Sequence, residues 1–232
     1  MRLHCDVVCV PRPDGIDPRG QDAYGFDERA GLVAVCDGAG SLFAAGDWAR
    51  CLVRRFVADP EPLLYGDPGP WVAAAAADWR AGLDLDTAGD RVRRAAAGGS
   101  GATIAAIRGV PHPDGYRLDV AAVGDTFVFV VRRGLLCLAH PPLPGDTFPA
   151  RPQLVTTSDP DPPARTSVEL QPGDTIAIAT DATARWVTGR GATFWPELAT
   201  LPADRLAHAL ARRRDEGEIA DDDLTLVRCH LR

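Results

Sequence analysis

The sequence predicts an α+β protein in which antiparallel strands outnumber helices. Short β-type segments follow one another closely, and turn signals at 28–31 and 132–134 join neighbouring segments as hairpins. Parallel units would alternate strands with crossover helices along the chain, and that alternation is missing from the pattern. The spacing therefore indicates antiparallel meanders, with helices inserted between groups of strands.

The predicted strands are short runs rich in Val, Ile, Leu and Ala. They cover residues 3–10, 22–27, 31–37, 101–108, 117–125, 126–139, 166–170, 174–181 and 224–231. Apolar residues at helical spacing predict helices over 41–59, with Ser41 as N-cap, and over 71–86 and 202–217. Residues 91–98 either continue the second helix or form a short separate one.

Two segments rich in Pro and Gly, 60–70 and 140–165, predict loops. A loop as long as the second is uncommon unless it is functional or mobile. The length of 232 residues is enough for one sizeable core, so we expect residues 1–232 to form a single domain. The sequence contains no run of about 18 apolar residues and no N-terminal signal pattern, which predicts a cytoplasmic protein.

The charge pattern argues against nucleic acid or an acidic membrane surface as the main partner. The formal net charge is −7, and the sequence contains no lysine, so all 25 basic residues are Arg. Any phosphate contact from a basic side chain must therefore be a planar guanidinium contact, which can be bidentate.

Six cysteines are present without a C-x-x-C pair or zinc-finger spacing. Most lie among Val, Leu and Ala, which favours reduced thiols acting as small buried hydrophobes. A metal site at His4, Cys5 and Cys9 is the alternative, and a structural role is the more common one for such a group.

Aspartates gather where predicted strands begin or end. Asp37, Asp125 and Asp181 follow apolar strands, Asp22 opens another, and residues 221–223 form an Asp triplet before the last strand. A single Asp at a strand end is usually a turn residue. Several in one domain, flanked by Gly or Thr, instead indicate an all-oxygen site for Mg²⁺ or Mn²⁺.

The order of these motifs resembles the type 2C metal-dependent protein serine/threonine phosphatases (PPM class), in their small bacterial single-domain form. The motifs are PRGQDAYG, VCDGAGS, GGSGATIAAI, AAVGDTFVFV, QPGDTIAIATDA and DDDLTLV, and they span nearly the whole chain. The resemblance implies an α-β-β-α sandwich of two antiparallel sheets flanked by helices, with metals in a cleft at one end.

The resemblance also implies roles for individual residues. Asp37 would bridge two Mn²⁺ or Mg²⁺ ions, and the Gly38 carbonyl would bind the second. Asp181 and Asp222 would be further ligands, so Asp37, Asp181 and Asp222 are the predicted catalytic set. Asp22 would be an outer ligand through water, and family members often use the residue at Asp125 for a third, weaker ion.

The sequence departs from the family pattern at several positions. The usual phosphate-binding Arg is replaced by Asp17, and Arg19, with Arg12 nearby, is the predicted substitute. Ala39 stands where some members carry a His proposed as general acid, so water would protonate the leaving group. Ala182 replaces a Gly of the Ser/Thr-Asp-Gly motif, and an Asp replaces the Asn after Asp222.

The predicted function is hydrolysis of phosphoserine and phosphothreonine in proteins by a metal-activated water at a two-ion centre. A phosphorylated protein is the expected substrate, and a Ser/Thr kinase or its target is an expected partner. The alternative is a catalytically weakened binding or regulatory module with the same fold. A nucleotide site at GGSGAT (98–103) is a third reading, and the missing lysine excludes the usual phosphate-binding loop.

Overall fold

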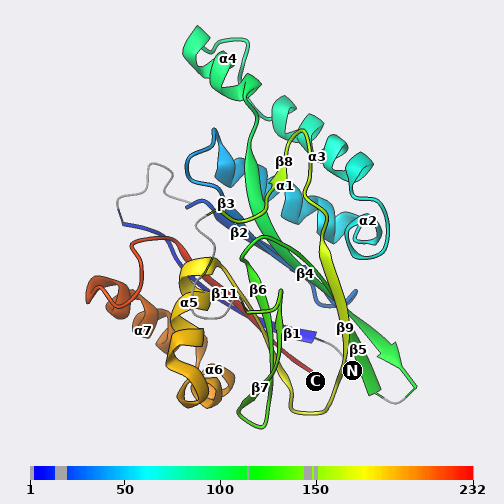
Figure 1. Cartoon of the computed structure of the whole chain (residues 1–232), viewed down its shortest axis with the longest axis vertical. Helices are drawn as coiled ribbons and strands as arrows, with labels where there is room; N and C mark the ends of the chain where they lie inside the picture. The colour runs from blue at the N-terminus through cyan, green and yellow to red at the C-terminus, as the bar shows by residue number, and fades with distance from the viewer. Residues whose placement is uncertain (1–2, 14–19, 114, 144–147, 149–150, 232) are drawn as a thin grey trace.

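The computed structural model describes residues 3–13, 20–113, 115–143, 148 and 151–231. Two antiparallel sheets stack face to face, and helices cover both outer faces (Figure 1). This arrangement confirms the predicted α+β class and the four-layer sandwich.

Every neighbouring pair of strands within the two sheets is antiparallel. The first sheet has the order β1 (Leu3–Val10), β11 (Leu224–Leu231), β10 (Thr175–Ala179), β6 (Phe127–Arg132) and β7 (Leu135–His140). The second has the order β2 (Asp22–Asp27), β3 (Leu32–Gly38), β4 (Gly101–His112), β5 (Gly115–Val123) and β9 (Ala164–Leu170), with β8 (Val155–Thr156) also on β4.

The helices fall into two groups along the chain. The first group is α1 (Ala45–Ala58), α2 (Glu61–Leu64), α3 (Gly69–Ala81) and α4 (Asp90–Ala97). The second is α5 (Asp181–Arg190), a 3₁₀ turn (Gly191–Thr193), α6 (Trp195–Thr200) and α7 (Ala203–Asp215). None of the helices in the described part of the chain has the length and apolarity needed to cross a membrane.

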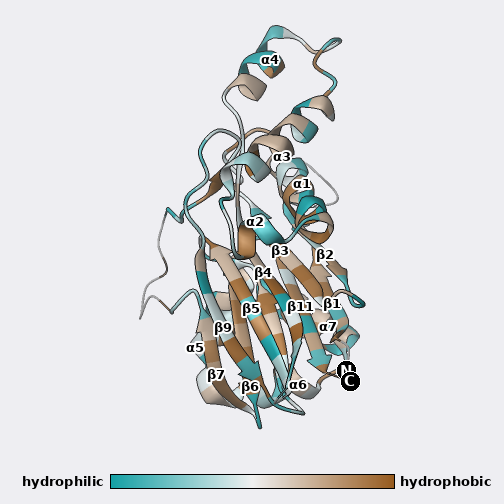
Figure 2. Ribbon diagram, turned by 90° about the vertical axis from the view of Figure 1, so that its right-hand side faces the viewer, coloured by the Kyte–Doolittle hydropathy of each residue, from teal (hydrophilic) through white to brown (hydrophobic). Residues whose placement is uncertain are grey.

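Three apolar layers hold these elements together. Val35, Ile107 and Ile178 belong to the layer between the sheets. Trp48 of α1 belongs to the layer outside the second sheet, and Leu206 of α7 belongs to the layer outside the first sheet. Figure 2 shows apolar residues concentrated along the strands of the sandwich. Burial on both faces explains why several strands read as continuous apolar runs instead of alternating ones.

The hairpin predictions are confirmed. The β2–β3 turn contains Gly31 with φ of 68°, and the β6–β7 turn contains Arg133 and Gly134 with φ of 52° and 76°. Positive φ favours glycine, since a side chain crowds the backbone there. The predicted strand 126–139 is therefore two strands joined by a tight turn.

Several local predictions were wrong. The first helix starts at Ala45 after Ala44, whose φ is 49°, so Ser41 is not its N-cap. Residues 181–200 contain α5 and α6, which the pattern did not predict, because their apolar face forms only against the first sheet. The predicted loops contain short elements as well, α2 within 60–70 and β8 within 140–165.

Candidate functional site

Two carboxylates face each other at one end of the β2–β3 pair. Asp22 opens β2, and the antiparallel register places it directly opposite Asp37 near the end of β3. Asp22 is only 8% exposed, and the Thr180 hydroxyl donates a hydrogen bond to its Oδ2 at 3.0 Å. Burial, reinforced by the charges of Asp223 and Asp222, raises the pKa of Asp22 to about 8.

Asp37 is the point where the predicted carboxylates come together. Its pKa lies well above the usual range, first because it is buried and then because like charges surround it. Those charges belong to Asp22, Asp181, Asp222 and Asp125. Because such repulsion weakens with distance, the structure places all four neighbours of Asp37 in one region, although they come from distant parts of the sequence.

Asp125 and Asp181 both pair with the guanidinium group of Arg185. Asp125 lies in the β5–β6 turn, Asp181 is the first residue of α5, and Arg185 lies one helical turn further on. Arg185 Nη2 is 2.9 Å from Asp181 Oδ2 and 3.6 Å from Asp125 Oδ2. Burial and the Asp181 charge raise the pKa of Asp125 to about 6, and Arg185 opposes that rise. The guanidinium also lies 5.0 Å from the centre of the Phe148 ring.

The Asp triplet before β11 divides into three environments. Asp223 is buried, and its carboxylate accepts hydrogen bonds from the main-chain N–H groups of Gln21 and of Arg12, the latter at 2.7 Å. Asp221 is exposed and pairs with Arg12 Nη2 at 2.9 Å. Asp222 accepts the Asp223 N–H at 2.9 Å, and burial raises its pKa. Along the chain, Asp221 is therefore solvated, Asp222 faces the site and Asp223 has a structural role.

Close backbone packing shapes the edge of the site at Gly38 and Gly20. A Cβ on Gly38 would lie 2.6 Å from the main-chain carbon of Ala45, at the start of α1. Gly20 has φ of 71°, and a Cβ there would lie 2.7 Å from Asp223 Oδ2. Only glycine fits at these two positions, because any side chain would collide with Ala45 or with Asp223. The start of α1 and the segment before β2 can therefore pack close to the carboxylates.

A cavity of about 780 Å³ opens beside this edge. Of the predicted site residues that the structure describes, Asp37, Gly38 and Asp222 line the cavity, and Asp22, Asp125 and Asp181 do not. Arg12 is part of the same lining. Arg19, the predicted phosphate contact, and Asp17 lie outside the described residues. Among the described residues, Arg12 is therefore the basic residue that lines this cavity, whereas Arg185 pairs with Asp125 and Asp181 outside it.

The chemistry of the donors fits a hard divalent cation. The group offers carboxylate oxygens and main-chain carbonyls. The raised pKa values of Asp22 and Asp37 reflect burial first and neighbouring negative charge second, and a cation would oppose both effects. In the described residues, no three His, Cys, Asp or Glu side chains converge tightly enough to enclose one metal ion. The fit therefore lies in donor type and charge, without a closed coordination shell.

Some site residues escaped the sequence-based reasoning. Thr180 and Arg185 contact the carboxylates, and neither was predicted. A helix starting at Asp181 would have revealed Arg185, because residues four apart share a helix face. The three residues of the predicted alternative do not form a three-ligand cluster: His4 pairs with Glu28 at 3.3 Å, and Cys9 contacts Thr225.

Solved structures of protein phosphatases share this architecture. The Mycobacterium tuberculosis serine/threonine phosphatase PstP/Ppp superposes with a TM-score of 0.68 at 20% identity, covering 100% of this chain and 99% of that one. The PstP catalytic domain in complex with two manganese ions gives 0.64 at 18% identity, covering 99% and 98%. The PPM Ser-Thr phosphatase MsPP from Mycobacterium smegmatis, in complex with cacodylate, gives 0.62 at 19% identity, covering 99% and 98%.

No protein-family model matches the sequence, and no curated protein sequence matches it significantly. The likeness is thus one of three-dimensional structure. The chain has the fold of the PPM-type serine/threonine phosphatases, as the order of its Asp motifs predicted.

Proposed function

We propose that this protein is a metal-dependent phosphatase that hydrolyses phosphoserine and phosphothreonine in proteins. One observation carries the proposal: Asp37 is buried opposite Asp22 and within the field of Asp181, Asp222 and Asp125, so that burial first and these like charges second hold its pKa well above the usual range. A fold shared with PPM-type phosphatases supports the same conclusion, as do the two manganese ions in the structure of the PstP catalytic domain.

Asp37, Asp181 and Asp222 would hold two Mn²⁺ or Mg²⁺ ions, with the Gly38 carbonyl as a further ligand. Asp22 would act through water, and Asp125 beside Asp181 could contribute to a third position. When bound, the ions would neutralise phosphate oxygens and acidify a water near neutral pH. Ionised carboxylates are needed for this role, so these residues act as ligands and not as proton donors.

Arg12 is the proposed phosphate contact. Arg12 lines the cavity with Asp37 and Asp222, and its main-chain N–H donates a hydrogen bond to Asp223. Its other described partner, Asp221, is exposed, so exchanging that ion pair for a phosphate costs little. Ala39 offers no proton, so the serine or threonine leaving group would take its proton from water.

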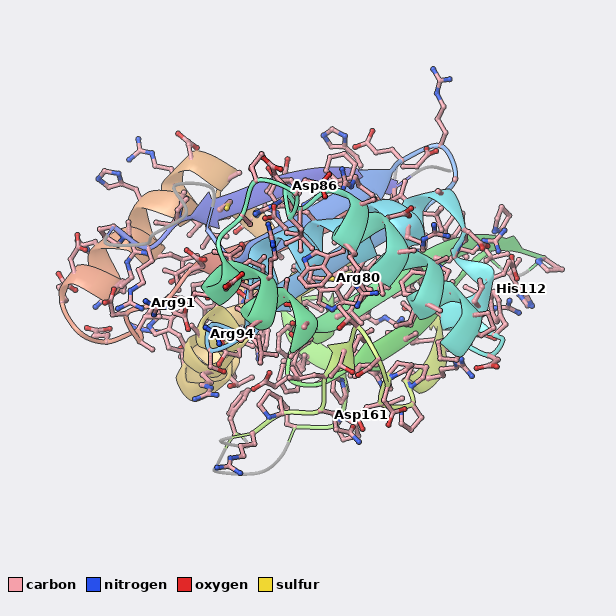
Figure 3. All side chains as sticks on the ribbon, turned by 90° about the horizontal axis from the view of Figure 1, so that it is seen from above. Arg80, Asp86, Arg91, Arg94, His112 and Asp161 are labelled. Carbon is pink, nitrogen blue, oxygen red and sulfur yellow. The ribbon has the colours of Figure 1, made fainter. Side chains whose placement is uncertain are left out.

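The substrate is proposed to be a phosphorylated protein. Arg91 and Arg94 of α4 are exposed on the helical extension seen from above in Figure 3. Ala97 ends α4 four residues before Gly101, whose carbonyl accepts the Ala39 N–H at 3.0 Å. Helix α4 therefore lies at the same end of the molecule as the site. There the positive charges of Arg91 and Arg94 would attract an anionic protein surface.

The test is hydrolysis of p-nitrophenyl phosphate and of a phosphothreonine peptide with and without Mn²⁺. We expect turnover that EDTA abolishes, and loss of turnover in Asp37→Asn and Asp181→Asn. The exposed Asp90 on α4 provides the matched control, Asp90→Asn, which should remain active. Full activity in Asp37→Asn or Asp181→Asn would overturn the proposed mechanism.

The Arg185 ion pair favours a second candidate, a binding or regulatory module with weak turnover. A guanidinium 2.9 Å from Asp181 competes with a cation for that carboxylate, and Ala182 departs from the family's usual glycine. Calorimetry showing Mn²⁺ binding without hydrolysis of either substrate would select this second function.

A further inference from the structure

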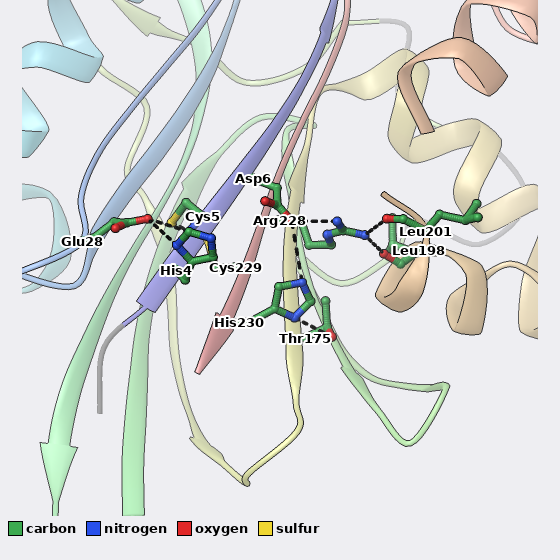
Figure 4. Close-up of polar contacts among 10 residues, drawn as sticks. All are labelled: His4, Cys5, Asp6, Glu28, Thr175, Leu198, Leu201, Arg228, Cys229 and His230. Carbon is green, nitrogen blue, oxygen red and sulfur yellow. Dashed lines mark hydrogen bonds and ion pairs between the residues drawn. The ribbon is translucent and has the colours of Figure 1, made fainter. Parts of the chain in front are cut away.

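Two cysteines from opposite ends of the sequence lie in contact. Cys5 in β1 and Cys229 in β11 are direct cross-strand partners, and their Sγ atoms are 3.2 Å apart (Figure 4). They are 224 positions apart in the chain. Both thiols lie on the side of the first sheet that faces the inter-sheet core.

The backbone around Cys5 brings the two strands close. The Cys5 N–H donates to Glu28 Oε1 at 2.8 Å, away from β11, so Cys5 and Cys229 form a non-hydrogen-bonded pair. Facing Cα atoms in such a pair are typically about 4.5 Å apart, within the range of about 4.4–6.8 Å that a disulfide spans. The sulfur atoms need to approach by only about 1.2 Å to reach bonding distance.

We propose that Cys5 and Cys229 form a reversible intramolecular disulfide that fastens the first strand of the chain to the last. Its formation requires a low-molecular-weight disulfide as oxidant. The Cys5 thiol loses its proton to solvent, and the thiolate attacks that disulfide, forming a mixed disulfide and releasing one thiolate, which takes up a proton. Cys229 then attacks Cys5 Sγ, its proton passes to the second departing thiolate, and two protein thiols are oxidised as one disulfide is reduced to two thiols.

Exposure sets the order of the two steps. Cys5 is half-buried and accessible to a small oxidant, whereas Cys229 is fully buried. The pKa of Cys229 lies well above the usual range, first because Cys5 shares a hydrogen bond with it and then because it is buried. Cys5 is therefore the entry point, and Cys229 completes the bond once Cys5 has been modified.

The two strands lead directly to the functional site. β1 ends two residues before Arg12, and β11 begins immediately after Asp223, which binds the Arg12 N–H. β1 is an edge strand held by β11 on one side. A covalent link between them would oppose fraying of β1, and closing so long a loop gives a disulfide its greatest stabilisation of the folded state.

Cys9 provides a matched control. It lies four residues after Cys5 on the same strand and is more exposed, but its cross-strand partner is Thr225. Equilibration of the full chain with oxidised glutathione should produce a Cys5–Cys229 peptide link by mass spectrometry, in the wild type and in Cys9→Ser. The link should raise Tm by about 5 °C or more, and dithiothreitol should reverse the shift.

Cys5→Ser should show no such shift and should keep the Tm of the reduced wild type within about 2 °C, because its side chain is only half-buried. The proposal is overturned if oxidised wild type contains no Cys5–Cys229 link, or if the link forms and Tm does not rise.

Discussion

Asp22 and Asp37 are paired directly across β2 and β3, at the end of a sheet whose interior is apolar. Like charges opposite one another destabilise an antiparallel pair, and the pKa values of both groups are raised, that of Asp22 to about 8. By itself, the Asp22–Asp37 pair lowers the stability of the folded protein. A bound cation would offset that repulsion, so the proposed metal site would gain affinity at the expense of the stability of the metal-free protein.

The stability of the metal-free protein should depend on pH through Asp22. The unfolded carboxyl titrates near its ordinary value of 3.8, and the folded one near 8. Between these values the folded state binds more protons, so the contribution of Asp22 to stability is complete below about pH 4 and is lost as pH rises towards 8. Asp125, with a pKa of about 6, acts in the same direction over a narrower window.

Urea unfolding in EDTA measures this effect. From pH 5 to 8 we expect the free energy of unfolding to fall in the wild type, and to fall by on the order of 2 kcal/mol less in Asp22→Asn. Asp90→Asn, with its exposed carboxylate, should retain the wild-type slope. Equal slopes in Asp22→Asn and wild type would show that Asp22 is ionised in both states.

Alanine substitutions should separate the members of the Asp triplet. Asp223→Ala removes the buried acceptor of two main-chain N–H groups and should cost about 2–4 kcal/mol of stability. Asp221→Ala removes one exposed ion pair and should change stability by less than about 1 kcal/mol.

Asp222→Ala should act on metal binding instead of folding. We expect Mn²⁺ affinity, measured by calorimetry, to fall by on the order of tenfold or more, with stability in EDTA unchanged or higher because a repelling charge is gone. Wild-type Mn²⁺ affinity in this variant would remove Asp222 from the ligand set.

Arg185→Gln should increase affinity for Mn²⁺. The guanidinium neutralises Asp181 and Asp125, and its loss leaves their charge to an incoming cation. An increase of about threefold to tenfold is expected from an ion pair of this exposure, and Tm in EDTA should fall. Arg190→Gln, on the same helix but over Trp186, serves as the control. Weaker Mn²⁺ binding in Arg185→Gln would indicate that Arg185 supports the site in another way.

Charge reversal on α4 should affect protein substrates selectively. In the double variant Arg91→Glu/Arg94→Glu, we expect KM for a phosphoprotein to rise several-fold while kinetics on p-nitrophenyl phosphate stay unchanged. The difference should shrink as salt is raised, because exposed charges are screened. The control is Arg29→Glu, because Arg29 lies on the β2–β3 turn, at the end of β2 and β3 opposite to Asp22 and Asp37. This variant should leave KM unaffected.

Local sequence chemistry accounts for much of the fold. The hairpin at Gly31 and the turn at Gly134 follow from residues that tolerate positive φ, and the amphipathic helix near 203–215 follows from its spacing of apolar residues. Elements whose apolar face depends on a distant partner were missed. The clearest case is α5, whose sequence shows little periodicity and whose buried residues contact the first sheet.

The sequence by itself determined the type of site: an ordered series of strand-end aspartates, with glycines beside Asp37, that specifies an oxygen-rich centre. Only the tertiary structure decided which of these aspartates lie close together and which basic side chain pairs with them. The Arg185 bridge depends on a helix that the sequence pattern did not predict, and the contact of Cys5 with Cys229 joins residues 224 positions apart. The degree of burial of Asp37 and Asp125 also depends on the packing of the whole sandwich. Electrostatic energy and thiol reactivity depend on distances and burial, and the folded chain sets both.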